Sequence, residues 1–123
     1  MSFRGTTVTF FRSSDGVLIG YQSQGHTGYA EAGSDIVCAA VSALTQTTLN
    51  GLKNILKAPL MFEADDSEAF IEVRILPEAS SQQLEQAQLL LRTLLEGLQA
   101  IEREYPRNVR IIFKERRLST CSK

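Results

Sequence analysis

Residues 80–105 carry the strongest periodic pattern in the chain. Apolar side chains recur there every three or four positions, while glutamines, glutamates and arginines occupy the opposite side. The apolar stripe consists of Leu84, Ala87, Leu91, Leu94, Leu95, Leu98 and Ile101. This spacing predicts one long amphipathic helix that ends at Pro106 and packs its apolar side against a second layer.

Five segments have the composition of strands. Residues 7–12 and 17–21 are rich in strand formers, and the Asp15-Gly16 step between them predicts a hairpin turn. Residues 60–63 and 69–75 lie on either side of an Asp65-Asp66 turn, and the second of them alternates apolar and charged residues, as expected for a sheet with one solvated face. Residues 109–113 form the last predicted strand.

Another helix is predicted after the second strand, beyond a glycine-rich loop. Ser34 or Asp35 can cap it, and Pro59 stops it. Gly51 is a point at which this helix can bend or divide. Its apolar positions at helical spacing are Val37, Ala40, Val41, Leu44, Leu52 and Ile55.

The order of elements is therefore β-β-α-β-β-α-β. Tight hairpins argue against a purely parallel sheet, so we predict an α+β fold in which two helices pack on a mixed or antiparallel sheet. The 123 residues suffice for one buried core, so we expect a single domain over residues 1–123. Residues 114–123 are expected to form a charged, mobile tail.

Composition narrows the possible environments and partners. The formal net charge of -1 gives no overall bias toward nucleic acid or anionic membranes, so any nucleic-acid role would need a local patch. We predict no direct nucleic-acid partner and no membrane partner. No apolar run approaches the roughly 20 residues that span a bilayer. Residues 1–4 lack the apolar core of a secretory signal, which predicts a cytoplasmic location.

A histidine and a cysteine occur together in one short segment. His26, the only histidine, lies in the glycine-rich loop twelve residues before Cys38. The second cysteine, Cys121, lies far away in the polar tail, so we expect both thiols to be free. The common role of a free cysteine is that of a small hydrophobic residue in a core.

The helical wheel favours a chemical role for Cys38. At about 100° per residue Cys38 shares a row with Asp35, Ser42, Thr45 and Leu49, which is mostly polar, while the apolar stripe follows Val37, Val41 and Leu44. Near the first turn the thiol would also be close to the unpaired N–H groups and the positive end of the helix dipole, which favour thiolate.

Three neighbouring residues have open alternatives. His26 either holds the loop in shape or acts as a base, and glycines at 25, 28 and 33 would let the loop fold back so that the imidazole reaches the sulfur. Asp35 either orients the imidazole or caps the helix, and Ser42 either donates into the site or bonds to its own helix. One histidine and one nearby cysteine fall short of a metal-ligand set, so we predict no metal and no cofactor.

The run Gly-His-Thr-Gly-Tyr-Ala-Glu-Ala-Gly followed by Asp-Ile-Val-Cys-Ala-Ala-Val-Ser-Ala-Leu resembles the signature of the ribosomal-processing cysteine protease family, often called Prp. The resemblance is dense over residues 25–44 and implies a small α+β fold and a homodimer. It implies that His26 and Cys38 form the catalytic dyad, that Asp35 and Ser42 are accompanying motif positions, and that Gly25 precedes the histidine. Thr27 departs from the expected alanine, which affects loop packing rather than chemistry.

The resemblance also implies a substrate. Members of the family remove an N-terminal extension from a large-subunit ribosomal protein precursor by cleaving after phenylalanine, a step in ribosome maturation in bacteria. The glycine loop would then act as a lid, with Gly28, Tyr29, Gly33 and Ile36 as substrate-binding candidates and Tyr29 and Ile36 as walls of the phenylalanine pocket. Leu89 and Leu90 flank the main apolar stripe, and this excess of apolar surface is compatible with a dimer interface.

Two other functions remain open. The chain could be a non-enzymatic ribosome-associated module that grips an apolar peptide in the glycine loop, with Cys38 incidental. A redox-sensing thiol is the second, and the lack of a nearby resolving cysteine disfavours it.

Overall fold

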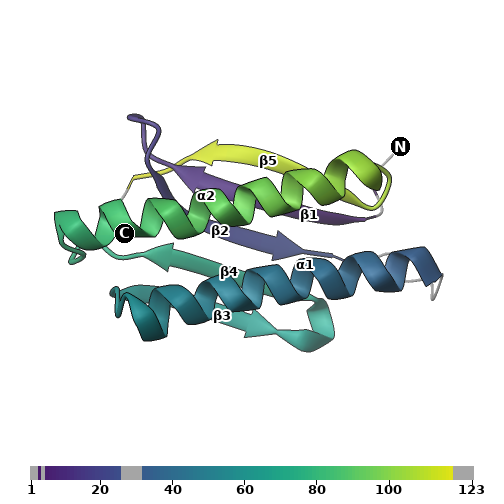
Figure 1. The fold of residues 1–123 in the computed structure, drawn as a ribbon, viewed down its shortest axis with the longest axis horizontal. Helices are drawn as coiled ribbons and strands as arrows, with labels where there is room; N and C mark the ends of the chain where they lie inside the picture. Colours follow the sequence, from purple (N-terminus) through teal and green to yellow (C-terminus); the bar gives the residue numbers. More distant parts are fainter. Residues whose placement is uncertain (1–2, 4, 26–31, 118–123) are drawn as a thin grey trace.

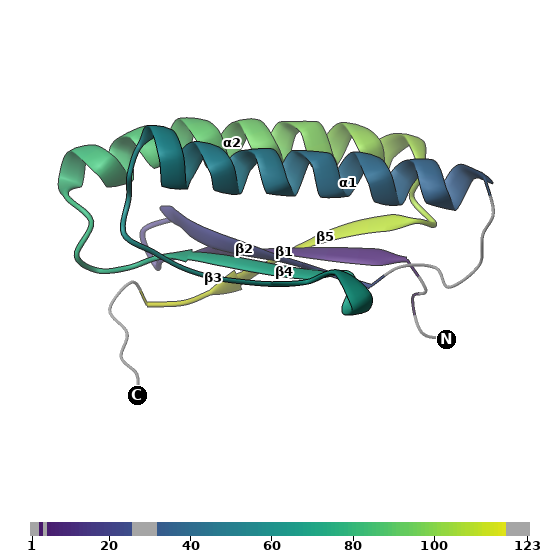
Figure 2. The same cartoon turned by 90° about the horizontal axis from the view of Figure 1, so that it is seen from below.

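The computed structural model describes residues 3, 5–25 and 32–117. It contains a five-stranded sheet with the strand order β3-β4-β2-β1-β5, and two long helices lie side by side on one face of that sheet (Figures 1 and 2). The pairs are antiparallel except for β1 with β5, which is parallel, so the sheet is mixed. The predicted α+β fold and the predicted order of elements are confirmed.

The first two strands form the hairpin that the Asp-Gly step predicts. β1 (Thr6–Arg12) pairs with β2 (Leu18–Gln24), and the turn between them contains Gly16 at φ +87°. The turn is closed by a hydrogen bond from the Ser13 backbone N–H to the Val17 carbonyl oxygen (2.8 Å). Gly16 occupies the left-handed region that favours glycine in such turns.

The second hairpin is β3 (Leu60–Asp65) followed by β4 (Phe70–Ile75). Asp65 is the last residue of β3, and a single 3₁₀ turn, η2 (Asp66–Glu68), connects the strands. Along β4 the buried residues alternate with half-buried ones, which confirms the predicted period of two.

The first helix differs from the prediction at both ends. α1 (Ala32–Asn50) begins before Ser34 and Asp35, so these residues lie in its first turn and do not precede it as caps. At Gly51 the chain changes to a π-helical turn, η1 (Gly51–Ile55), in which the Leu56 N–H donates to the Gly51 carbonyl oxygen (3.0 Å). The wider turn rotates Ile55 off the apolar side, and 81% of this residue is exposed. Its predicted place in the apolar stripe is therefore wrong.

The long predicted helix is present as α2 (Ser81–Glu104). Ser80 caps it through a reciprocal capping box with Gln83, a local signal that fixes the first turn. The stripe is buried against the sheet and α1 at Ala87, Leu91, Leu94 and Leu98. No helix in the described part of the chain has the combination of length and apolar character that a membrane crossing requires.

The last strand is longer than predicted. β5 (Val109–Glu115) pairs with β1 over its whole length, and Lys114 and Glu115 stand opposite Phe11 and Arg12. These two residues fall in the range predicted as tail, but they belong to the sheet because β1 still offers backbone partners there. All predicted strands are present, with ends that shift by at most three residues.

Candidate active site

Gly25 fixes the start of the loop that carries the histidine. It follows β2 directly and has φ +99°, a backbone conformation that residues other than glycine rarely adopt. Its N–H donates to the Ala69 carbonyl oxygen (3.2 Å), and its own carbonyl accepts from the Thr6 hydroxyl (2.9 Å). A Cβ atom at this position would come within 2.9 Å of the Gly5 carbonyl oxygen. The backbone is therefore held between the ends of two neighbouring strands just before residue 26.

Several predicted site residues lie outside the described part of the chain. These are His26, Gly28 and Tyr29, together with Thr27. What the structure defines are the two ends between which they run, Gly25 at the end of β2 and Ala32 at the start of α1. Both ends lie toward the same end of the molecule (Figure 1).

Cys38 is the candidate nucleophile. It is the seventh residue of α1, a free thiol that is half-buried. Two nearby residues of the helix, Val37 and Val41, are buried in the core, while Ala39 and Ser42 are exposed. Cys38 thus lies at the border between the buried and exposed sides of the helix, a position from which a sulfur can meet a substrate.

The early start of α1 changes the electrostatic argument for Cys38. Because the helix begins at Ala32, the four N–H groups without intrahelical partners belong to residues 32–35, and Cys38 lies in the second turn. The dipole effect falls off within the first turn. The predicted closeness of the thiol to the helix start is therefore wrong by about one turn, and Gly33 and Asp35 occupy the first turn instead.

Ile36 and Ser42 lie on the same helix as the thiol, but only Ser42 shares its side, since Ile36 is about 200° around the helix axis from Cys38. Ile36 is 63% exposed, which leaves apolar surface two residues before Cys38. Ser42 lies one turn after Cys38 on the same side, is exposed, and accepts at its carbonyl oxygen from the Thr45 hydroxyl (3.2 Å). The polar row predicted for this side ends there, because Thr45 and Leu49 are buried.

The position of α1 depends on a tyrosine that the sequence pattern did not single out. The buried hydroxyl of Tyr21 donates to the Thr45 carbonyl oxygen (2.7 Å). Burial raises the pKa of Tyr21 far above its ordinary value, although a hydrogen bond with the Leu49 backbone opposes this shift. Tyr21 thus ties β2 to the middle of α1 at two adjacent turns. A tyrosine on the helix-facing side of a strand was the available signal, because its hydroxyl needs a partner when buried.

The described residues contain no group of three or more His, Cys, Asp or Glu side chains arranged to hold a metal ion. The chemistry on this side of the molecule is that of an accessible thiol on a helix, next to a loop anchored at a strand end. Such a thiol is the kind of group that attacks carbonyl carbon in cysteine hydrolases.

Comparison with known families identifies this class more closely. The family model described as "Cysteine protease Prp" matches residues 6–110, which include Gly25, Cys38 and every strand and helix up to the first two residues of β5. The chain belongs to the ribosomal processing cysteine protease Prp family.

Relatives are similar over nearly their whole length. The ribosomal processing cysteine protease Prp of Staphylococcus aureus (strain Mu50) is 31% identical over 88% of this chain and 98% of its own. A crystal structure of the S. aureus protease with a substrate peptide superposes with a TM-score of 0.76 at 29% identity, covering 89% of this chain and 99% of that one. A Streptococcus mutans protein matches with a TM-score of 0.77 at 28% identity over 91% and 96% of the two chains.

Proposed function

We propose that this protein is a cysteine endopeptidase that removes the N-terminal extension of a large-subunit ribosomal protein precursor by cleaving after phenylalanine. Cys38 is the nucleophile, and His26 is the general acid and base. The observation that carries the proposal is the half-buried free thiol of Cys38 on α1, following a loop whose first residue, Gly25, is held in a glycine conformation. Membership of the Prp family supplies the reaction class.

The reaction proceeds in two steps. His26 takes the proton of the Cys38 thiol, the sulfur attacks the carbonyl carbon of the phenylalanine, the C–N bond breaks, and the leaving amine takes that proton from His26. A water molecule then gives a proton to His26 while its oxygen attacks the thioester carbonyl carbon. The C–S bond breaks, the carboxylic product leaves, and the sulfur takes the proton back from His26, so that the thiol reforms. The N–H groups of the first turn of α1 are candidates for stabilising the oxyanion, because they lack intrahelical partners.

A related structure supports the covalent step. The S. aureus protease has been solved with a covalently linked product peptide. A covalent bond between enzyme and product is what a nucleophilic cysteine forms during acyl transfer. By the similarity of the two folds, Cys38 is the residue of this chain proposed to form that bond.

Ile36 provides a candidate wall for the phenylalanine side chain. It is largely exposed and lies two residues before Cys38 on α1, about 200° around the helix axis from the thiol, so it would contact the substrate from the other flank of the helix. We propose that the glycine loop closes over the peptide as a lid, and that Gly28, Tyr29 and Gly33 bind the substrate with Ile36. Asp35 and Ser42 act as supporting residues on the same helix.

We also propose that the protein acts as a homodimer in the cytoplasm, where its ribosomal substrate is made. Support for a second copy comes from Leu89 on α2, which is 72% exposed despite its place beside the apolar stripe. Sedimentation at micromolar concentration tests this, and a purely monomeric species would contradict it.

The alternative is a non-enzymatic ribosome-associated module that binds an apolar peptide. The exposed Ile36 next to a glycine-rich loop is the observation that favours it. In that case Cys38 would have no chemical role. Substituting it would leave the affinity for the peptide unchanged, and the peptide would stay uncleaved.

Mass spectrometry of a peptide carrying the N-terminal extension tests both functions. We expect cleavage after phenylalanine by the unmodified chain, and loss of cleavage in Cys38→Ala and in His26→Ala. Thr47→Ala, an exposed substitution on the same helix, is the matched control and should cleave normally. An intact peptide with folded, reduced protein would contradict the protease and favour the binding module.

A further inference from the structure

The sheet has one face that no element of the described chain covers. Both helices lie on the other face, as Figure 2 shows. Because side chains alternate along each strand, the residues between the buried core positions point to this open face. On β1, β4 and β5 the open face consists of Thr7, Thr9, Phe11, Phe70, Glu72, Arg74, Arg110, Ile112 and Lys114.

Charge is distributed unevenly around this face. Residues 107–117 contain five of the chain's 13 basic residues and one of its 14 acidic residues, so this segment is strongly positive although the chain is not. Along the described open face of β1 and β5 no acidic side chain occurs. Arg110 and Lys114 lie on the same side of the edge strand β5, and Arg116 follows just beyond its end. Alternate residues of a strand are about 6.6 Å apart, so Arg110 and Lys114 stand about 13 Å apart with Ile112 between them, and Arg116 continues the row.

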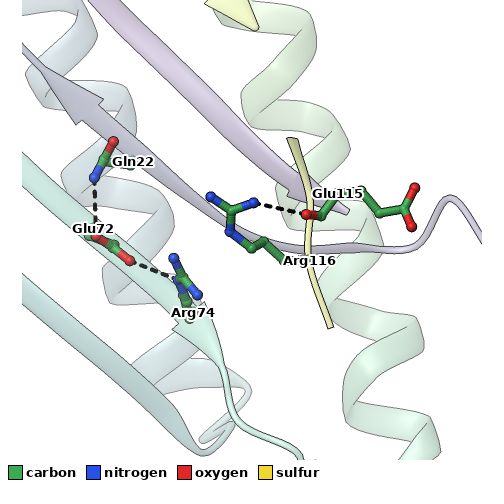
Figure 3. A network of polar contacts seen from close by, with 5 residues as sticks. All are labelled: Gln22, Glu72, Arg74, Glu115 and Arg116. Atoms are coloured by element: carbon green, nitrogen blue, oxygen red, sulfur yellow. Dashed lines mark hydrogen bonds and ion pairs between the residues drawn. The ribbon is translucent and has the colours of Figure 1, made fainter. Parts of the chain in front are cut away.

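Two arginines are ordered on this face by a buried aromatic ring. Phe11 is only 2% exposed, although it faces away from the helices. The guanidinium carbon of Arg74 lies 4.4 Å from the centre of its ring and that of Arg116 lies 5.4 Å from it. The two cations therefore cover one ring, Arg74 from β4 and Arg116 from just beyond the end of β5. Figure 3 shows the polar contacts of these two side chains.

The polar contacts of these arginines hold them in place. Glu72 accepts from the Nε of Arg74 (2.7 Å) and from the side-chain amide of Gln22 (3.1 Å), and Arg116 donates to the Glu115 carbonyl oxygen (3.0 Å). Glu72 offsets one charge, while Arg110, Lys114 and Arg116 stand on strands that contribute no carboxylate to this face. The result is a positive surface that is partly preorganised.

We propose that the open face of β5, β1 and the end of β4 binds single-stranded RNA. A linear row of cations fits a linear polyanion, and arginine matches the geometry of phosphate better than lysine does. The guanidinium planes that rest on Phe11 have outer sides on which bases can stack. An anionic membrane fits less well, because the rings beside these cations, Phe3 at Arg110 and Phe11 at Arg74 and Arg116, are already covered by guanidinium groups.

The RNA site and the thiol lie on different layers. α1 carries Cys38 on the helical side of the sheet, while the basic row lies on the other side (Figure 2). Both can be occupied at once, so RNA contact would hold the protein at a ribonucleoprotein particle without blocking peptide access. The proposal does not depend on the protease assignment, because its test measures RNA affinity alone.

The test is fluorescence anisotropy with a labelled single-stranded RNA of about 20 nucleotides, titrated with the full chain at several salt concentrations. For single strands the slope of log K against log[salt] is about −0.7 per phosphate neutralised, so removing three cations should reduce the slope by about 2. We expect the Arg110→Gln/Lys114→Gln/Arg116→Gln variant to lose at least about tenfold in affinity near 50 mM salt. The matched control neutralises Lys53, Arg92 and Arg103, three exposed cations of the helical layer, and should bind like the unmodified chain.

Several outcomes would overturn the proposal. They are the absence of saturable RNA binding at low salt, an equal loss in the control, and equal or tighter binding to phosphatidylserine vesicles or to polyglutamate. If circular dichroism shows that the triple variant is unfolded, the Arg110→Gln/Lys114→Gln pair replaces it, because it leaves the Arg74–Phe11–Arg116 stack intact. That pair should still reduce the salt slope by about 1.4, and an unchanged slope would contradict the proposal.

Discussion

Two glycines with positive φ offer a matched test of how the loop before the thiol helix is anchored. Gly25 has φ +99° and Gly16 has φ +87°, so alanine is strained at both. The surroundings differ, since a Cβ atom at Gly16 would meet nothing within 4 Å, whereas one at Gly25 would lie 2.9 Å from the Gly5 carbonyl oxygen. The comparison separates backbone strain, which the two substitutions share, from the close approach that only Gly25 has.

The magnitudes follow from these contacts. A left-handed backbone costs an L-residue about 1–2 kcal/mol, which is the expected loss for Gly16→Ala. The close contact at Gly25 forces a strand end to shift, and overpacking of that kind adds about 1–2 kcal/mol. For a domain of this length about 1 kcal/mol corresponds to about 4 °C in Tm. We therefore expect a fall of about 4–8 °C for Gly16→Ala and of about 8–16 °C for Gly25→Ala.

Thermal unfolding followed by circular dichroism gives both values, and the peptide assay gives the functional effect. Gly16→Ala should cleave normally, because its turn lies away from the loop. Gly25→Ala should cleave poorly even well below its Tm, since the displaced backbone is directly bonded to residue 26. Equal Tm losses for the two variants, or full activity of Gly25→Ala, would refute the reasoning that this contact sets the start of the loop.

Three other predictions concern the core and the thiol. Tyr21→Phe removes a buried hydrogen bond to α1 and should lower Tm by about 4–6 °C, at about 1–1.5 kcal/mol. Leu91→Ala opens a cavity in the core and should lower the free energy of unfolding, measured in urea, by about 2–5 kcal/mol, whereas Gln86→Ala, at an exposed position of α2, should change it by no more than about 0.5 kcal/mol. In a Cys121→Ser background, iodoacetamide should modify Cys38 rapidly at pH 7 if it is an activated nucleophile, and slow modification would contradict that role.

Elements whose signals are local were predictable from the sequence. α2 carries its own apolar period and its own cap at Ser80, and β4 alternates residue by residue, so neither needs information from elsewhere in the chain. The helix divides at Gly51, as the sequence allowed, but the π-helical form of the next turn was not predictable, because Leu52 and Ile55 also fit the spacing of an ordinary helix. The parallel pairing of β1 with β5 depends on two segments far apart in sequence, which no local pattern reports.

In the candidate site, too, some residues could be predicted from local sequence and others could not. Gly25 and Cys38 could be selected from residue type and spacing, since glycine permits a backbone that other residues do not, and a thiol is a reactive group wherever it lies. The hydrogen bond by which Tyr21 holds α1 could not be predicted, because it depends on which turn of α1 passes over β2. The start of α1 was also misplaced, since residues that are favourable caps are equally compatible with a first turn.

Net charge conceals the surface on which the RNA proposal rests. The chain sums to -1 because its 14 acidic residues outnumber its 13 basic ones by one. Most of the acidic residues lie on α2, β3, β4 and the turns, while β5 and the residues around it hold a dense basic run. Folding separates these charges, since the edge position of β5 and its pairing with β1 place Arg110 and Lys114 on one side, where Arg116 joins them over Phe11. A polyanion responds to the potential within about 10 Å of the surface at ordinary salt, so this local row decides binding and the sum over the whole chain does not.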